Sequence, residues 1–122
     1  MGLKHSTSKS FKYAFQGFHT AFTNEPNFRI HILIAFIALI FALIIKLNTL
    51  EWLLLAFTIF YVLTLELLNT VLEAIVDLVS PEITPYAKIA KDVSATCVLM
   101  AAGMSILVGV ALFLPKIISI LN

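Results

Sequence analysis

The chain has 122 residues, of which 61% are hydrophobic and 12% are charged, and its formal net charge is +1. Soluble globular domains contain roughly 45–50% apolar and about 25% charged residues. A chain of this length cannot hide so much apolar surface from water, so the composition excludes a soluble globule and a disordered chain. The near-neutral charge gives no support for a nucleic-acid partner. We therefore expect an all-α, polytopic membrane protein embedded in a lipid bilayer.

The first expected element is an amphipathic helix at about residues 8–23. Its four phenylalanines recur at the spacing of one helical face; they are Phe11, Phe15, Phe18 and Phe22. Two compatible interpretations are open: the helix lies in the membrane interface, or it packs on the chain's own helix bundle. The following Asn24-Glu25-Pro26 segment ends the helix, because the residue before a proline disfavours the α conformation.

Three long apolar segments follow, each with the length of a membrane span: about residues 26–47, 52–79 and 86–114. The short Lys46–Glu51 turn separates the first two spans. A loop with two prolines, at residues 80–85, separates the second and third and marks a new helix start. We expect residues 1–122 to form a single membrane-embedded domain of three transmembrane helices and one surface helix.

The distribution of cations predicts the orientation of the spans. Only Lys46 and Lys116 lie on the side of the Lys46–Glu51 turn. Six cations lie on the side that the N-terminus shares with the loop around residue 85: Lys4, Lys9, Lys12, Arg29, Lys88 and Lys91. Because cytoplasmic segments carry an excess of Lys and Arg, we expect the N-terminus and this loop to be cytoplasmic.

The second expected span carries a polar stripe along one helical face. Its members are spaced at 0, +3, +4, +7 and +11: Glu66, Asn69, Thr70, Glu73 and Asp77. Counting about 1.5 Å per residue from Trp52, Glu66 lies about 21 Å inside the outer interface and Asp77 about 37 Å inside it. In a hydrocarbon core about 30 Å thick, Glu66 is submerged, whereas Asp77 reaches the cytoplasmic surface. A charge at such a depth is costly, so we expect Glu66 to be protonated, paired or part of a wet active site.

A hydrogen-bonded stripe that only joins helices is the alternative without chemistry. Asn69 and Thr70 suit that alternative well. Three carboxylates suit it poorly, because acids repel one another and add a desolvation cost without matching cations in the spans. The stripe therefore favours a functional site.

Carboxylates near water suit a hard cation such as Mg²⁺, which is usually held by one or two carboxylates together with substrate phosphates. Glu25, at the break before the first span, has the same expected depth as Glu73 and is a candidate second ligand. Nearby charges at Lys91 and Asp92 point to a phosphorylated ligand. The submerged Glu66 is a candidate base for a hydroxyl at the level of the lipid headgroups. Together these residues predict a membrane-embedded phosphotransferase.

The pattern Glu66-x-x-Asn69-Thr70-x-x-Glu73-x-x-x-Asp77, followed by Ala90-Lys91-Asp92, resembles the signature of the small bacterial diacylglycerol kinase and undecaprenol kinase family. The segment Asn24-Glu25-x-x-Phe28-Arg29 is similar to the other polar motif of that family. The resemblance implies a homotrimer in the bacterial plasma membrane, with active sites shared between protomers and Mg-ATP as phosphoryl donor to a lipid alcohol. Oligomerisation is also expected because three spans alone cannot enclose a polar stripe.

The resemblance also implies roles for individual residues. Glu66 would be the general base, and Asn69 would support it. Glu25 and Glu73 would hold the Mg²⁺ ion. Residues implied in nucleotide binding are Tyr13, Glu25, Glu73, Asp77, Glu82, Thr84, Lys91 and Asp92. Asp77 would in addition organise the cytoplasmic end of the site.

The expected lipid acceptor follows from positions at which this chain differs from the members of the family that prefer diacylglycerol. Members that prefer diacylglycerol carry more basic residues in the amphipathic helix, where this chain has Gln16 and His19, and they have a serine in place of Ala95. Pro81-Glu82 and the phenylalanine-rich helix look more like the branch that uses undecaprenol. We expect conversion of undecaprenol to undecaprenyl phosphate, with diacylglycerol to phosphatidic acid as the alternative.

An alternative of another class is a proton-coupled transporter subunit or small channel, with Glu66 and Asp77 as relay groups. This alternative explains a submerged acid but gives no role to Glu25, Lys91 and Asp92. The three histidines have no metal-ligand spacing, and we expect all of them to be interfacial: His5, His19 and His31.

Overall fold

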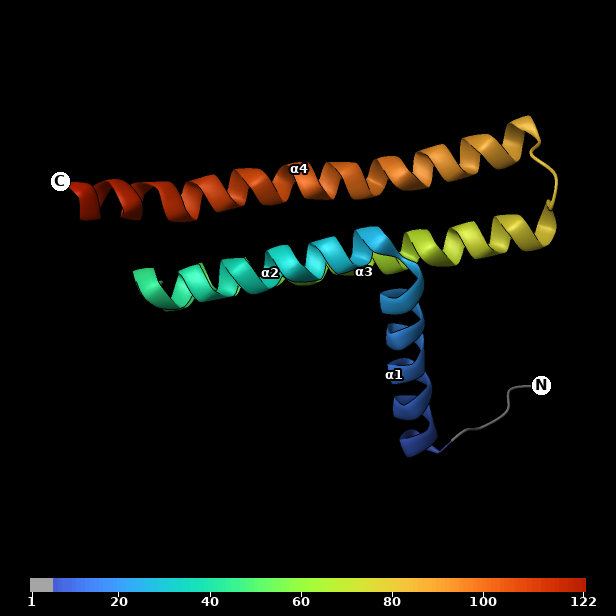
Figure 1. Cartoon of the computed structure of the whole chain (residues 1–122), viewed down its shortest axis with the longest axis horizontal. Helices are drawn as coiled ribbons and strands as arrows, with labels where there is room; N and C mark the ends of the chain where they lie inside the picture. Colours follow the sequence, from blue (N-terminus) through green and yellow to red (C-terminus); the bar gives the residue numbers. More distant parts are fainter. Residues whose placement is uncertain (1–5) are drawn as a thin grey trace.

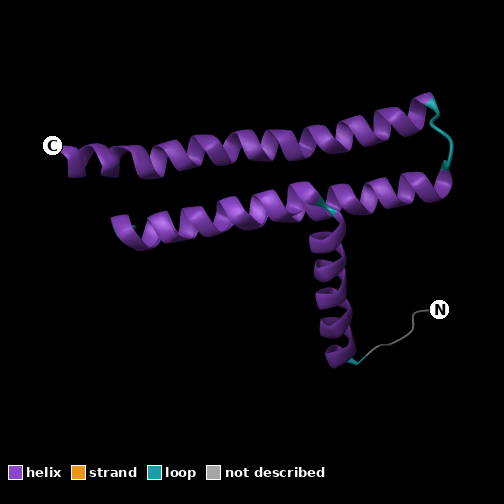
Figure 2. Cartoon of the chain, viewed as in Figure 1, coloured by secondary structure: helices purple, strands orange, loops and turns teal. Residues whose placement is uncertain are grey.

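The computed structural model describes residues 6–122, which form four helices and no strand: α1 (Thr7–Asn24), α2 (Pro26–Ile45), α3 (Thr49–Val79) and α4 (Pro85–Leu121). Short loops join the helices (Figure 2). The predicted all-α fold is confirmed. Lys4 and His5, which entered the count of cations and the set of histidines, lie outside the described residues.

Helices α2, α3 and α4 run side by side, whereas α1 projects away from them across their direction (Figure 1). Each of the three long helices is long and apolar enough to cross a membrane, as expected from the sequence. Helix α4 continues past the end of its apolar run at Leu114, with Pro115 inside it. The chain is therefore a multi-pass membrane protein built on a three-helix unit.

The junction between α1 and α2 is fixed by Arg29. Its Nη1 atom donates hydrogen bonds to the carbonyl oxygens of Phe22, at 3.0 Å, and Thr23, at 2.8 Å. These carbonyls belong to the last turn of α1, where a cation is favourable because the acceptors have no helical partner. Glu25 lies between the two helices in an extended conformation, and Pro26 opens α2. The junction therefore holds Glu25 at the N-terminal end of α2.

Glu51 organises the opposite end of the three-helix unit. Its backbone N–H donates to Asn48 Oδ1, and its carboxylate accepts from the backbone N–H of Asn48, each at 2.9 Å, so the two residues form a capping box at the start of α3. The Glu51 carboxylate also lies 3.0 Å from Nζ of Lys116 on α4. Glu51, which lies outside the polar stripe, thus has a structural role.

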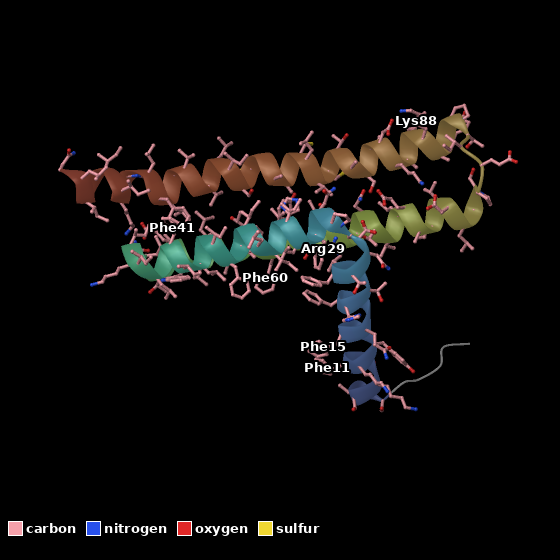
Figure 3. The ribbon with its side chains drawn as sticks, in the orientation of Figure 1. Phe11, Phe15, Arg29, Phe41, Phe60 and Lys88 are labelled. Atoms are coloured by element: carbon pink, nitrogen blue, oxygen red, sulfur yellow. The ribbon has the colours of Figure 1, made fainter. Side chains whose placement is uncertain are left out.

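Most large apolar side chains point outward. Figure 3 shows Phe60 on the outside of the long helices, where it is 70% exposed. Such exposure is expected in a membrane, because lipid tails solvate apolar side chains as well as a protein core does. A small buried cluster closes the end of the unit near the α2–α3 turn and consists of Ala42, Leu47, Leu55 and Leu112.

The phenylalanines of α1 have two kinds of surroundings. Phe18, near α2, packs on the chain's own helices, and those farther away are exposed, as a helix in the membrane interface would have them. Phe18 packs edge-to-face on the buried Phe28 of α2, with ring centroids 5.3 Å apart. Phe11 and Phe15 lie on the same side of α1 (Figure 3) and are exposed. The end of α1 next to α2 is therefore packed on the chain, and the other end offers its phenylalanines to another surface.

Candidate active site

The polar stripe of α3 runs from a buried carboxylate to an exposed one. Glu66 is 5% exposed, and Asn69, Thr70 and Glu73 are half-buried. Asp77 is exposed near the C-terminal end of the helix. Because one face of a helix repeats every three to four residues, a single element positions the whole stripe. Helix α3 therefore carries polar groups from the interior of the unit to the loop that precedes α4.

Glu66 is paired with a histidine. Its Oε1 atom lies 3.3 Å from Nε2 of His31 on α2. The side chains are 20% exposed for His31 and 6% exposed for Glu66, so the contact is shielded from the surroundings. The hydroxyl of Thr70 donates to the backbone oxygen of Glu66, at 3.1 Å, and not to its carboxylate. Of the three states expected for a submerged glutamate, the structure therefore shows the paired one.

Asn69 joins α4 to Glu73. Its Nδ2 atom donates to Oε1 of Glu73 at 3.1 Å, and its Oδ1 atom accepts from Oγ of Ser94 at 2.6 Å. Ser94 is buried on α4. The Asn69 amide thus links Ser94 to Glu73. The resemblance had implied that Asn69 would support Glu66 instead.

The donor set fits a hard cation that also binds phosphate. Glu25 and Glu73, the two expected ligands, each lie close enough to Glu66 to interact with it electrostatically. The described residues contain no group of three or more His, Cys, Asp or Glu side chains that could hold a metal ion alone. Two carboxylates leave most of an octahedral shell to water and phosphate oxygens, which is the usual arrangement for Mg²⁺ in phosphoryl-transfer sites.

The C-terminal end of α3 and the N-terminal end of α4 are joined by an ion pair between Asp77 and Lys91. Lys88, labelled near the α3–α4 loop in Figure 3, pairs with Asp92 one turn along α4. A pocket of about 230 Å³ lies between the loop and these helix ends, and its lining includes four residues expected to bind nucleotide: Asp77, Glu82, Lys91 and Asp92.

The other two residues expected to bind only nucleotide, Thr84 and Tyr13, do not line this pocket. Thr84 caps α4 by accepting a hydrogen bond from the backbone N–H of Ala87 at 3.2 Å. Tyr13 is half exposed on α1, which projects away from the helices that carry the stripe (Figure 1). A single chain thus gathers most of the expected nucleotide residues at one end of α3 and α4, and leaves Tyr13 on a separate arm.

The sequence did not predict the positions of His31 and Ser94 in the site. His31 was expected to be interfacial, but the structure places it against Glu66 inside the helix unit. An ionisable residue within an apolar run requires a partner, and this signal was present at His31. Ser94 gave no comparable signal, because a serine in an apolar helix commonly bonds to its own backbone.

A family model for prokaryotic diacylglycerol kinase matches residues 12–113. A diacylglycerol kinase of Synechocystis sp. is 42% identical over 113 residues, which cover 92% of this chain and 65% of that relative. An undecaprenol kinase of Bacillus subtilis is 38% identical over 109 residues, which cover 89% of each chain. A diacylglycerol kinase of Haemophilus influenzae is 33% identical over 100 residues, or 82% of this chain and 84% of the relative. The chain belongs to the prokaryotic diacylglycerol kinase family, a family of lipid kinases.

Proposed function

We propose that the chain uses Mg-ATP to phosphorylate undecaprenol to undecaprenyl phosphate at the cytoplasmic face of a bacterial plasma membrane. The observation that carries this proposal is the stripe on α3, which links a buried, paired carboxylate at Glu66 to the pocket beside Asp77. A lipid alcohol has its hydroxyl at the headgroup level, and a nucleotide approaches from water. The stripe connects these two regions, so a site along it suits a reaction between a lipid and ATP.

In the proposed reaction, Glu66 accepts the proton of the lipid hydroxyl. The hydroxyl oxygen forms a bond to the γ-phosphorus, and the bond from that phosphorus to the bridging oxygen of ADP breaks. Positioning and charge neutralisation supply most of the catalysis in phosphoryl transfer. Glu66 suits the role of base because His31 holds its carboxylate in place on the stripe that leads to the pocket.

We propose that Glu25 and Glu73 hold the Mg²⁺ ion, which neutralises charge on the transferring phosphates when it is bound. Asn69 would keep Glu73 in place through the hydrogen bonds to Glu73 and Ser94. Asp77, Glu82, Lys91 and Asp92 would form the nucleotide end of the site, with Asp77 orienting Lys91. Thr84 would act by capping the helix that carries Lys91.

We further propose that the protein is a homotrimer with its N-terminus in the cytoplasm and α1 on the membrane surface. Two observations support shared sites: the stripe is only partly covered within one chain, and Tyr13 lies on a helix that projects away from it. A neighbouring protomer would complete the enclosure that a polar stripe needs in a membrane.

Undecaprenol is favoured over diacylglycerol by Gln16, His19 and Ala95, which depart from the diacylglycerol-preferring pattern, and by the Bacillus relative that matches over 89% of each chain. The Synechocystis relative, named a diacylglycerol kinase, supports diacylglycerol as the second candidate. Transfer of labelled γ-phosphate from ATP to each lipid, measured in parallel with purified protein in vesicles, tests the proposal. We expect faster transfer to undecaprenol, and faster transfer to diacylglycerol would reverse the assignment.

The same assay tests the class of protein. A proton-coupled transporter or channel would transfer phosphate to neither lipid, and it would instead change the internal pH of vesicles when a proton gradient is applied. We expect phosphate transfer and no proton flux that depends on Glu66.

A further inference from the structure

We propose that His31 is a positioning residue for the reaction, and that it holds Oε1 of Glu66 so that Oε2 is left to accept the proton of the lipid hydroxyl. This inference rests on the proposed function. Its starting observation is the 3.3 Å contact between Nε2 of His31 and Oε1 of Glu66, which joins α2 to α3 within the span.

Within the described part of the chain, His31 is the one side chain at ion-pair distance from Glu66 that can carry a positive charge. The other charged groups that act on Glu66 are the carboxylates of Glu25 and Glu73, which repel it. A carboxylate surrounded by apolar helices and two other acids needs a donor, because an uncompensated charge in such a place is strongly disfavoured. Nε2 carries an N–H both in the charged ring and in the neutral tautomer that is protonated at Nε2, so His31 can be a donor to Glu66 in either charge state.

The position of His31 also separates two environments. His31 contacts Glu66, and it also lines an apolar cleft of about 190 Å³ between α2, α3 and α4, together with residues such as Ala35, Val62 and Val108. His31 is therefore a polar group that borders both the apolar cleft and the stripe. A group at this boundary can fix the direction of the carboxylate without contacting ATP.

A purely structural role for the contact, as a polar bridge between α2 and α3, would give a different pattern of effects. Loss of a bridge lowers stability and should do so whether or not Glu66 can act as a base. Loss of a positioning contact lowers turnover only while Glu66 retains its carboxylate. A double-mutant cycle between the two residues separates these roles.

The experiment uses the full chain reconstituted in vesicles with undecaprenol and, separately, diacylglycerol, and it measures kcat, KM for ATP and the melting temperature. The variants are His31→Leu, His31→Gln, His31→Asn, Glu66→Gln and the double variant H31L/E66Q. Thr64→Leu on the exposed side of α3 is the matched control for placing a leucine at a polar position in the span.

We expect His31→Leu to lower kcat by at least about tenfold, a loss typical of residues that orient a catalytic group, while KM for ATP stays within about twofold. His31→Gln should recover much of the loss, because its amide nitrogen reaches the place of Nε2. His31→Asn should not, because its amide nitrogen lies at the place of Nδ1. In the Glu66→Gln background, His31→Leu should cause no further loss of kcat, and Thr64→Leu should behave like the parent.

The inference is overturned by any of three results with an active parent protein. These are a kcat for His31→Leu within about twofold of the parent, equal kcat values for the Gln and Asn variants, or an undiminished effect of His31→Leu in the Glu66→Gln background. A parent protein that phosphorylates neither lipid overturns the proposed function, and the inference with it. The two failures are thus distinguished by the activity of the parent.

Discussion

The hydroxyl of Ser94 donates a hydrogen bond to the side-chain oxygen of Asn69 across 2.6 Å. Because one end of the amide is used in this way, its nitrogen must face Oε1 of Glu73, to which it donates at 3.1 Å. A buried serine on α4 thus sets the orientation of a carboxylate on α3 through one intervening amide. The arrangement couples the packing of two helices to the position of a proposed Mg²⁺ ligand.

The first prediction concerns this relay. Ser94→Ala leaves the Asn69 oxygen without its donor, so the amide can rotate and Glu73 is held less firmly. We expect a higher KM for Mg-ATP with a smaller change in kcat, since Glu66 is not part of the relay. Thr96→Ala is the control, because Thr96 is exposed and bonds to the backbone of its own helix. An unchanged KM for Mg-ATP in Ser94→Ala would show that the relay does not serve the metal site.

The second prediction concerns the metal itself. Glu73→Gln keeps an oxygen that can accept from Asn69, but it removes the negative charge that a Mg²⁺ ligand needs. We expect Mg²⁺-dependent turnover to be lost while the protein still inserts and assembles. Glu51→Gln, at the opposite end of the unit, is the matched control. Activity that survives in Glu73→Gln at saturating metal and ATP would remove Glu73 from the metal site.

The sequence predicted the fold well because its strongest signals are local. Length and apolar content predicted three spans, and Pro26 and Pro85 marked the starts of α2 and α4. The extent of α4 beyond Leu114 was not predicted, because the charge and proline there end the apolar run without ending the helix. The stripe from Glu66 to Asp77 was predicted because a helical period alone defines it.

The partners of the stripe were harder to predict. Period and depth place Glu66 on a face, but they do not say which helix covers that face or at what register. The contact with His31 and the hydrogen bond from Ser94 depend on how α2 and α4 pack against α3. These contacts join residues that are far apart in the chain. In the sequence, a histidine near a span end also fits an interfacial position, and a serine in an apolar helix also fits a bond to its own backbone.

The third prediction concerns topology. Thr49 is the first residue of α3, and the exposed Ile83 lies on the loop after that helix, so the two residues mark its opposite ends. In a Cys97→Ala background, which removes the exposed native thiol, we expect Thr49→Cys to react with an impermeant maleimide from outside the cell. Ile83→Cys should react only in inside-out vesicles. The reverse pattern would place the proposed nucleotide pocket on the wrong side of the membrane for ATP.

The fourth prediction separates the two members of the Asp77–Lys91 pair. Both side chains are substantially exposed, so the pair contributes little to stability. We expect Lys91→Ala to raise KM for ATP, because it removes a cation from the pocket. Asp77→Asn should raise KM for ATP to a lesser extent, since it frees Lys91 without removing its charge, and neither variant should change the melting temperature much. Equal KM values for Lys91→Ala and the parent would exclude Lys91 from nucleotide binding.

The last prediction concerns Glu66 and separates catalysis from binding and from structure. General-base assistance is worth typically 10²–10⁴-fold in rate, and Glu66→Gln removes it while keeping the shape of the side chain and an oxygen that can face His31. We expect kcat to fall by at least about 10²-fold with little change in KM for ATP, whereas Glu73→Gln weakens nucleotide binding through the metal. The melting temperature should be unchanged or slightly higher, because a submerged carboxyl group is costly in a span. A stripe that only joins helices would give the opposite result, with lower stability and near-normal turnover in the folded fraction. Measurement of kcat and melting temperature on one purified variant therefore decides between the two roles, and a near-normal kcat would rule out Glu66 as the base.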